Sequence, residues 1–369
     1  MDPRCNRYNT LNLTNVFHAH AYASYGTGGG WVNDFFPLIL SVGLVTNLSF
    51  LFVIARVPRM RTTPNLYLAL QTMADIIFLL TSTIPLFINY IFKDPRSTKM
   101  TTSFGCYSFN ALRSSCYYVS LVSVTLVSFD RFVAVVYPLK FRLFRSKRNT
   151  AISVIVLLLI AGVSALFTSL DYAVNTTVCM IWPPETEQFA HMPTIRFRCS
   201  RYHPLTKLWN TIFNIIVFTI ALSCNIGFYS GIIYKLSSRS VATQHSSNTE
   251  VNKTRNQIAK LVICNGIIFL LCQMPTRAII IIQLLRSMSL IPKLPRNVFM
   301  YLNMLRAAVL VNSSVNALIY PVLSPFYRVA YIEAFCKFRE KCQRGKAKGE
   351  ASVTSNAIKT DGATLNSHM

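Results

Sequence analysis

The sequence predicts an all-α membrane protein, a bundle of seven transmembrane helices followed by a short amphipathic eighth helix. The 369 residues are 52% hydrophobic and only 14% charged, whereas about a quarter of the residues in soluble domains are charged. Seven apolar stretches are long enough to cross a bilayer core of roughly 30 Å and far too long for single β-strands. They cover approximately residues 35–55, 65–92, 107–136, 150–170, 208–234, 261–285 and 297–321.

The spans divide the chain into three expected parts. Residues 1–34 form an N-terminal segment without the apolar core of a cleavable signal peptide. Residues 35–321 form the helix bundle, with short connections and no internal repeat. Residues 322–369 supply the eighth helix and a polar tail. The absence of a repeat disfavours a transporter or channel, because transporters are often built from repeated halves around a midplane site.

The distribution of basic residues predicts an extracellular N-terminus and a place in the plasma membrane. With this orientation, 22 of the 37 Lys and Arg residues lie on the cytoplasmic side and 12 on the outer side. An excess of basic residues in short loops marks the cytoplasmic face. Most of the net charge of +24 then belongs to a cytoplasmic collar of basic residues that meets anionic lipid, and it does not indicate a nucleic-acid site. Asn12 and Asn175, each in an Asn-X-Thr sequence, become candidates for N-glycosylation.

Asp75 lies in the middle of the second span, where a charge is costly and must face polar partners inside the bundle. Two interpretations remain open for this polar cluster, a hydrogen-bonded core and a sodium site. The candidate partners are Asn47, Ser120, Asn312, Ser313 and Asn316.

Three arginines are the other isolated charges of the spans: Arg113, Arg277 and Arg306. A helical rise of about 1.5 Å per residue puts all three in the outer half of the bundle. One interpretation is that they bind an anionic or acceptor-rich group of a ligand. The other is that they extend to the membrane surface or pair with acidic loop residues.

Helical spacing adds two further residues to the predicted ligand site. Arg113 and Tyr117 share a face of the third span, and Gln273 lies one turn below Arg277. The predicted ligand-binding residues are therefore Arg113, Tyr117, Gln273, Arg277 and Arg306.

Several motifs resemble those of rhodopsin-like G-protein-coupled receptors. The third span ends in Asp130-Arg131-Phe132, similar to the family's Asp-Arg-Tyr, and the seventh ends in Asn316-Ala-Leu-Ile-Tyr320, similar to Asn-Pro-x-x-Tyr. The stretch from Ser324 to Cys336 resembles the eighth helix of the family. The resemblance covers about residues 35–337, and its other matches are Asn47, Asp75, Cys106, Pro138 and Phe269–Pro275.

The chain also departs from the family pattern. Gln273 stands where the family has a tryptophan above the proline of the sixth span, and Ala317 replaces the proline of the seventh-span motif. Ala221 replaces the usual proline of the fifth span, and the fourth span has no tryptophan. These changes affect the usual activation mechanics more than the fold.

The resemblance implies a cell-surface receptor that binds an extracellular neuropeptide and activates a heterotrimeric G protein. Amine receptors have an aspartate at the position of Arg113, and opsins have a retinal-binding lysine at the position of Leu310. The Cys179-Met-Ile-Trp-Pro sequence resembles the second outer loop of tachykinin-type receptors. The alternatives are a receptor for a small anionic, carboxylate-type ligand and a membrane transporter. The chain is not expected to be an enzyme, because all six His lie outside the spans.

The resemblance also implies roles for individual residues. Asp75, Ser120, Asn312, Ser313 and Asn316 resemble the family's sodium pocket, and apart from an allosteric sodium ion no cofactor is expected. The residues expected to couple to the G protein are Asp130, Arg131, Tyr229, Asn316 and Tyr320.

The remaining predictions concern the cysteines and the C-terminal tail. Four outer cysteines allow three pairings; the family pattern favours Cys106–Cys179, which leaves Cys5–Cys199, and Cys106–Cys199 is the alternative. Cys336 and Cys342 follow the eighth helix and are candidates for palmitoylation. The Ser/Thr-rich stretches 237–254 and 352–367 are candidate substrates of a receptor kinase, with arrestin as a further partner.

Overall fold

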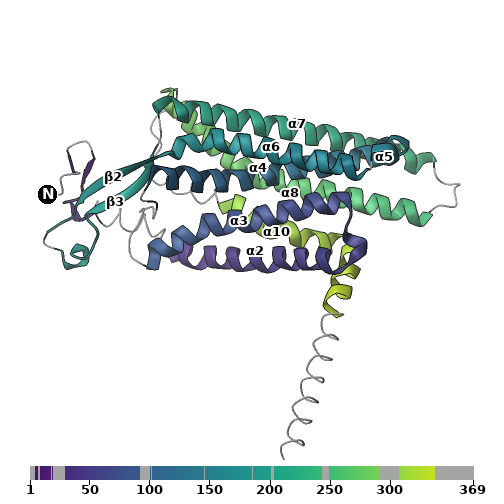
Figure 1. Cartoon of the computed structure of the whole chain (residues 1–369), viewed down its shortest axis with the longest axis horizontal. Helices are drawn as coiled ribbons and strands as arrows, with labels where there is room; N and C mark the ends of the chain where they lie inside the picture. Colours follow the sequence, from purple (N-terminus) through teal and green to yellow (C-terminus); the bar gives the residue numbers. More distant parts are fainter. Residues whose placement is uncertain are drawn as a thin grey trace, which may run out of the picture.

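The computed structural model describes residues 5–6, 9–17, 19, 30–91, 100, 102–144, 146–184, 186–200, 203–242, 249–290 and 307–336. Within these residues, six helices are long and apolar enough to cross a membrane. A seventh helix, α10 (Ala307–Leu323), covers the described part of the last expected span. Together they form the predicted seven-helix bundle, in which α10 lies beside α2 and α3 (Figure 1). The six are α2 (Gly30–Arg56), α3 (Thr63–Ile91), α4 (Ser103–Val136), α6 (Lys147–Ser169), α7 (Pro204–Ala242) and α8 (Thr249–Ser287).

The helices expose large apolar side chains on their outer faces and bury several polar side chains among the apolar clusters of the interior, which is unlike a soluble bundle. Leu159 and Val163 on α6 and Leu271 on α8 are exposed, whereas Asn47 on α2 and Asp75 on α3 are buried. Backbone groups in lipid must be hydrogen-bonded within the segment, and helices meet this need. The pattern is that of a bundle surrounded by hydrocarbon.

Two helices extend far beyond the spans predicted from the sequence. α7 and α8 have 39 residues each, a length of about 58 Å, whereas the bilayer core is about 30 Å thick. Both therefore extend beyond the membrane at the end of the bundle opposite the strands (Figure 1). The short helix α5 (Pro138–Phe144) lies at the same end.

A three-stranded sheet forms the other end of the bundle, which we call the sheet end. β2 (Val174–Ile181) and β3 (Ile195–Ser200) make an antiparallel hairpin, and β1 (Thr10–Asn12) adds to β2 in parallel. A small apolar cluster supports the sheet: Leu13, Ala19, Met180, Trp182 and Phe189. Short 3₁₀ turns flank these strands at Leu170–Tyr172 and Glu187–Phe189, and a third, Pro58–Met60, joins α2 to α3.

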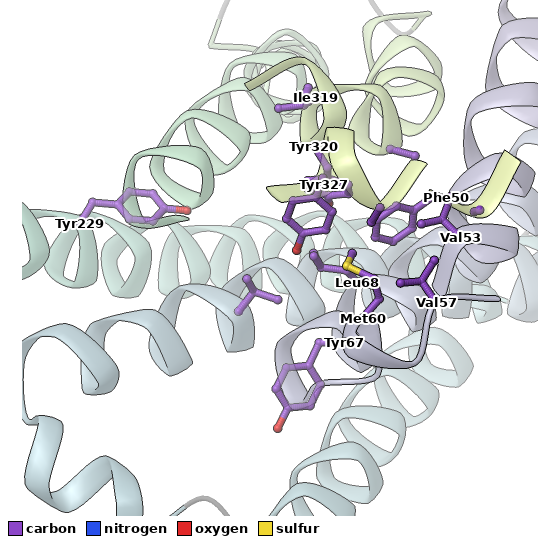
Figure 2. Packing of buried hydrophobic residues seen from close by; sticks show 14 residues of the cluster. Phe50, Val53, Val57, Met60, Tyr67, Leu68, Tyr229, Ile319, Tyr320 and Tyr327 are labelled. Carbon is purple, nitrogen blue, oxygen red and sulfur yellow. The ribbon is translucent and has the colours of Figure 1, made fainter. Parts of the chain in front are cut away.

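The largest apolar cluster lies at the opposite end, where α10 meets the expected eighth helix, Pro325–Cys336 (Figure 2). The two helices are bent by 99° at Ser324. Pro325 explains the break, because a proline disfavours the helical conformation of the residue before it. The rings of Phe50, Tyr320 and Tyr327 pack together at this corner, with centroids 4.9 to 6.2 Å apart.

Candidate functional site

A buried polar cluster surrounds Asp75, which is only 1% exposed. Ser120 of α4 and Ser313 of α10 donate hydrogen bonds to Asp75 Oδ1, over 3.2 and 2.9 Å. Asn316 Nδ2 donates to Oδ2 over 3.0 Å. Both carboxylate oxygens thus have donors from two other helices, which explains how the bundle holds this charge.

Two expected members of this cluster do not contact the carboxylate. Asn312 is buried beside Ser313, and its Oδ1 has no hydrogen-bond partner among the described residues. Asn47 Nδ2 donates instead to the carbonyl oxygens of Gly43 and Ser313, over 2.7 and 2.9 Å. The cluster therefore joins α2, α3, α4 and α10, and the side-chain oxygens of Asn47 and Asn312 have no hydrogen-bond partner among the described residues.

A second buried charge, Arg277 of α8, lies nearer the sheet end. The residue is 6% exposed. Its guanidinium carbon lies 5.1 Å from the ring centroid of Tyr117 and 4.8 Å from that of Phe218. Its Nε has no hydrogen-bond partner among the described residues. The two rings stabilise the charge through cation–π contacts, but they leave an N–H group without an acceptor.

The other predicted ligand-binding residues differ in burial and in whether the structure describes them. Gln273, one turn away on α8, is 2% exposed, and its Oε1 has no partner in the described part of the chain. The Tyr117 hydroxyl is likewise buried without a partner there. Arg113, one turn from Tyr117 towards the sheet end, is exposed. Arg306 falls outside the described residues.

A chain of polar residues that was not predicted from the sequence runs from Tyr118 of α4 to Asp171. Tyr118 donates its hydroxyl to Asn214 Oδ1 over 3.0 Å, and Asn214 Nδ2 donates to the Asn210 carbonyl over 2.9 Å. Asn210 Nδ2 reaches Asp171 Oδ2 over 3.5 Å. Asn210, Asn214 and Phe218 are four residues apart on one face of α7, a signal that the periodicity of the fifth span contains.

The residues expected to meet a G protein lie at the end opposite the sheet. Arg131 Nε is 3.9 Å from Asp130 Oδ2, an ion pair between adjacent residues on α4. The Tyr229 hydroxyl of α7 lies 2.9 Å from Ser128 Oγ of α4. Gly266 of α8 makes this possible, because a Cβ there would collide with the Tyr229 ring.

A second contact at this end ties the expected eighth helix to the connection between α2 and α3. The Tyr327 hydroxyl donates to Asn65 Oδ1 over 2.6 Å, and Asn65 Nδ2 donates to the Met60 carbonyl. Burial raises the pKa of Tyr327 to about 12, so the phenol remains a donor at physiological pH. Arg59 pairs with Glu333 over 3.0 Å. These contacts fix the bend after α10.

The disulfides differ from the expected pairing. Cys106 of α4 bonds Cys199 of β3, and Cys5 bonds Cys179 of β2, with Cα–Cα distances of 5.5 and 5.8 Å. The expected pairs Cys106–Cys179 and Cys5–Cys199 are therefore wrong, and the alternative Cys106–Cys199 is present.

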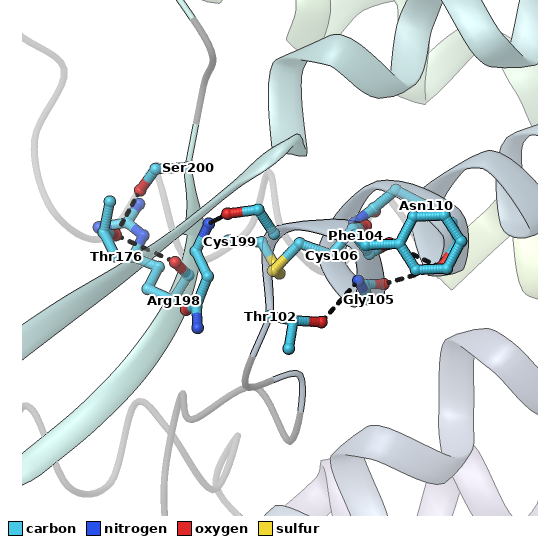
Figure 3. The surroundings of a disulfide bond; sticks show 12 residues. Thr102, Phe104, Gly105, Cys106, Asn110, Thr176, Arg198, Cys199 and Ser200 are labelled. Carbon is cyan, nitrogen blue, oxygen red and sulfur yellow. Dashed lines mark hydrogen bonds between the residues drawn. A yellow bond between two sulfur atoms is a disulfide. The ribbon is translucent and has the colours of Figure 1, made fainter.

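Strand register explains the difference. Asn175 pairs with Cys199, and the Asn175 N–H donates to Ser103 Oγ at the start of α4, so this base of the hairpin lies near Cys106 (Figure 3). Cys179 is four residues further along β2, about 13 Å away. It instead pairs with Thr10 of β1, which brings Cys5 within reach.

The candidate modification sites differ in exposure. Asn12 is exposed, and its Oδ1 accepts hydrogen bonds from the Thr14 N–H and hydroxyl over 3.0 and 2.8 Å. Asn175 is half-buried within β2. Cys336 is exposed at the end of its helix, and Cys342 lies outside the described residues. The stretch 237–254 overlaps the helical ends of α7 and α8.

These features define the class: a multi-pass membrane protein with buried charges inside a seven-helix bundle. Residues 46–320 match the family of the 7 transmembrane receptor (rhodopsin family). The match covers more than half of the chain, which therefore belongs to this family of receptors and is not an enzyme. Such a protein is a multi-pass protein of the plasma membrane.

Individual relatives are distant. The chain is 24% identical to lysophosphatidic acid receptor 4 of Mus musculus over 69% of its own length and 64% of that receptor. It thus spans less than two thirds of this relative. It is 23% identical to the human thyrotropin-releasing hormone receptor, over 87% of the chain and 82% of the relative. It is 22% identical to the galanin-like G-protein coupled receptor npr-9 of Caenorhabditis elegans, over 84% and 74%.

Proposed function

We propose that this chain is a receptor with an extracellular N-terminus that binds a peptide in the outer half of its bundle and activates a heterotrimeric G protein. The observation that supports a ligand site there is Arg277. It is a buried cation held by two aromatic rings, with an N–H that has no acceptor among the described residues. An uncompensated charge within a membrane span is a functional-site candidate.

The ligand group at this site is an acidic or strongly hydrogen-bond-accepting part of the peptide. Arg277, Tyr117 and Gln273 contact it, and Arg113 and Arg306 contribute further positive charge. Peptide is favoured over other classes because two relatives are named for peptides and match most of the chain: the thyrotropin-releasing hormone receptor and the galanin-like receptor. Their own ligands are not assigned to this chain.

A second candidate is a small anionic ligand. The match to lysophosphatidic acid receptor 4 supports it, and so does the excess of basic over acidic residues on the expected outer side. A phosphate or carboxylate forms strong charge-assisted hydrogen bonds with arginine. Arg277 binds the ligand in this case too. The two candidate functions therefore differ in the class of ligand and not in the binding site.

Further sites follow from the same proposal. Asp75 and its hydroxyl and amide partners hold a sodium ion, and no other cofactor is needed. Asp130, Arg131, Tyr229, Asn316 and Tyr320 serve G-protein coupling at the cytoplasmic end. Asn12 and Asn175 accept glycans, Cys336 and Cys342 accept palmitate, and the Ser/Thr-rich stretches serve a receptor kinase and arrestin.

The test is guanine-nucleotide exchange on added heterotrimeric G proteins, with membranes that contain the receptor. Amidated peptides, acidic peptides and lysophospholipids are applied separately. Exchange with peptides supports the lead, and exchange with lysophospholipids alone supports the second candidate. If no G protein exchanges nucleotide with any ligand, while a control receptor in matched membranes responds, the receptor function is wrong.

A further inference from the structure

Besides Thr276 Oγ1, three polar groups at or near Arg277 lack hydrogen-bond partners among the described residues. They are the Arg277 Nε–H, the Gln273 Oε1 and the Tyr117 hydroxyl, and each of these atoms is buried. Buried polar groups in proteins are almost always hydrogen-bonded, so each unpaired group here requires an explanation. Three together, on two facing helices, suggest that a ligand completes them.

The chemistry of the three groups is mixed. Arg277 Nε can only donate, Gln273 Oε1 can only accept, and the Tyr117 hydroxyl can do both. Gln273 and Arg277 are four residues apart on α8, a spacing that brings side chains to about 5–6 Å of each other. One small planar group can therefore reach both residues if it has an acceptor on one side and a donor on the other.

We infer that this site takes a carboxamide, such as an amidated peptide end, a backbone amide or an Asn or Gln side chain of the ligand. This inference rests on the proposed function and specifies its ligand group. The carboxamide oxygen accepts from Arg277 Nε, and the carboxamide N–H donates to Gln273 Oε1. The Tyr117 ring lies against the Arg277 guanidinium, and its unpaired hydroxyl is a third group that can bond the same ligand.

A carboxylate or phosphate satisfies the site less well. Neither anion has a donor at neutral pH, so the Gln273 oxygen stays unpaired in the orientation that its amide has in the structure. A buried acceptor left unpaired is expected to weaken binding by about tenfold. The charge of Arg277 does not require an anion, because the Tyr117 and Phe218 rings already stabilise the cation.

The surroundings favour a carboxamide attached to an apolar body. Phe218 belongs to a buried apolar cluster with Tyr118, Leu121 and Phe269, and Tyr117 packs against it. An aromatic or aliphatic neighbour of the carboxamide would pack against these rings. Benzamide, a ring with one carboxamide, is therefore the simplest probe of the site, and benzoate is its matched carboxylate.

The experiment measures thermal unfolding of the purified full-length receptor against increasing benzamide or benzoate. We expect benzamide to bind about tenfold more tightly than benzoate. Gln273→Met removes the acceptor, keeps the length of the side chain and should bring the two probes within about threefold of each other. Gln71→Met is the control: Gln71 is another buried glutamine, on α3, and this variant should keep the preference for benzamide.

Two results would overturn the inference. If benzoate binds more tightly than benzamide and the binding is lost in Arg277→Gln, the carboxamide assignment is wrong, while an anion-binding receptor remains. If neither probe stabilises the receptor, water rather than a ligand completes the three groups. The peptide-driven nucleotide exchange described above then decides the proposed function independently.

Discussion

Asp75 and Arg277, two buried charges of the bundle, have different surroundings. Asp75 receives three hydrogen bonds from Ser120, Ser313 and Asn316, so that both of its oxygens are paired within the protein. Arg277 contacts two aromatic rings, and its Nε has no acceptor among the described residues. A charge paired by its own fold can be structural, whereas a charge left without an acceptor requires a partner from outside. The following predictions test this distinction.

The largest effect is expected from removing the disulfide at the sheet end. Cys199→Ser breaks the bond that holds the hairpin on α4, and loss of a native disulfide costs roughly 2–5 kcal/mol. Surface expression or peptide response should be lost, because the hairpin is no longer fixed to α4 at the sheet end of the bundle. Immunodetection on intact cells measures the surface receptor.

Two controls sharpen this prediction. Cys5→Ser should be milder, because hydrogen bonds between β1 and β2 still hold the N-terminal segment. Peptide mapping without reduction should recover Cys106 linked to Cys199. Recovery of Cys106 linked to Cys179 would contradict the strand register and the pairing together.

The next effect concerns Arg277. Arg277→Gln keeps much of the side-chain length and removes the charge, so agonist potency should fall about 30-fold or more, as expected for loss of a desolvated charged contact. Agonist-driven nucleotide exchange at matched surface expression measures the change. Arg113→Gln and Arg306→Gln test the rest of the arginine set in the same assay.

Arg286→Gln provides the control, since Arg286 lies in the last turn of α8, about two and a half turns beyond Arg277. It should respond like the parent. If Arg113→Gln, Arg277→Gln and Arg306→Gln all stay within about threefold of the parent, the arginines are not the ligand anchors.

A smaller effect is expected at Asp75, the charge that is hydrogen-bonded within the protein. Asp75→Asn keeps an oxygen for Asn316, and its new N–H₂ group can donate to the hydroxyls of Ser120 and Ser313, which can turn to accept. The receptor should therefore stay folded and lose about 1 kcal/mol of stability. Its charge is gone, so sodium should no longer stabilise it.

Thermal unfolding in sodium chloride and in choline chloride measures this loss. The parent should unfold at a higher temperature in sodium, and Asp75→Asn should unfold at the same temperature in both salts. Equal sodium dependence in the parent and the variant would mean that Asp75 holds no ion.

The smallest effect on stability and potency is expected in the polar chain that runs from Tyr118 to Asp171. Tyr118→Phe removes the hydroxyl that donates to Asn214 Oδ1, a neutral hydrogen bond worth about 0.5–1.5 kcal/mol. Thermal stability should fall slightly, and agonist potency should change less than about threefold. A loss as large as that of Arg277→Gln would assign the Asn210–Asn214 face of α7 to the ligand site.

Helical periodicity is enough to predict much of the site. The spacing of Arg113, Tyr117 and Ser120 assigned them to one face of the third span, and the structure has Tyr117 against Arg277 and Ser120 against Asp75. Phe218 and the chain through Asn210 and Asn214 were missed. Their spacing of four residues assigns them to one face of α7, but their partners lie on other elements, which local spacing does not reveal.

The sequence by itself determined the seven spans, their polar faces and the depth of Asp75 and Arg277, because hydrocarbon requires continuous helices whose polar side chains point inward. Tertiary structure decided which distant segments meet. The register of three strands selected Cys106–Cys199 and Cys5–Cys179. The packing of α4, α7 and α8 placed two rings, and no acceptor among the described residues, beside the Arg277 N–H. Such contacts depend on how helices and strands far apart in the chain are arranged, which local patterns do not encode.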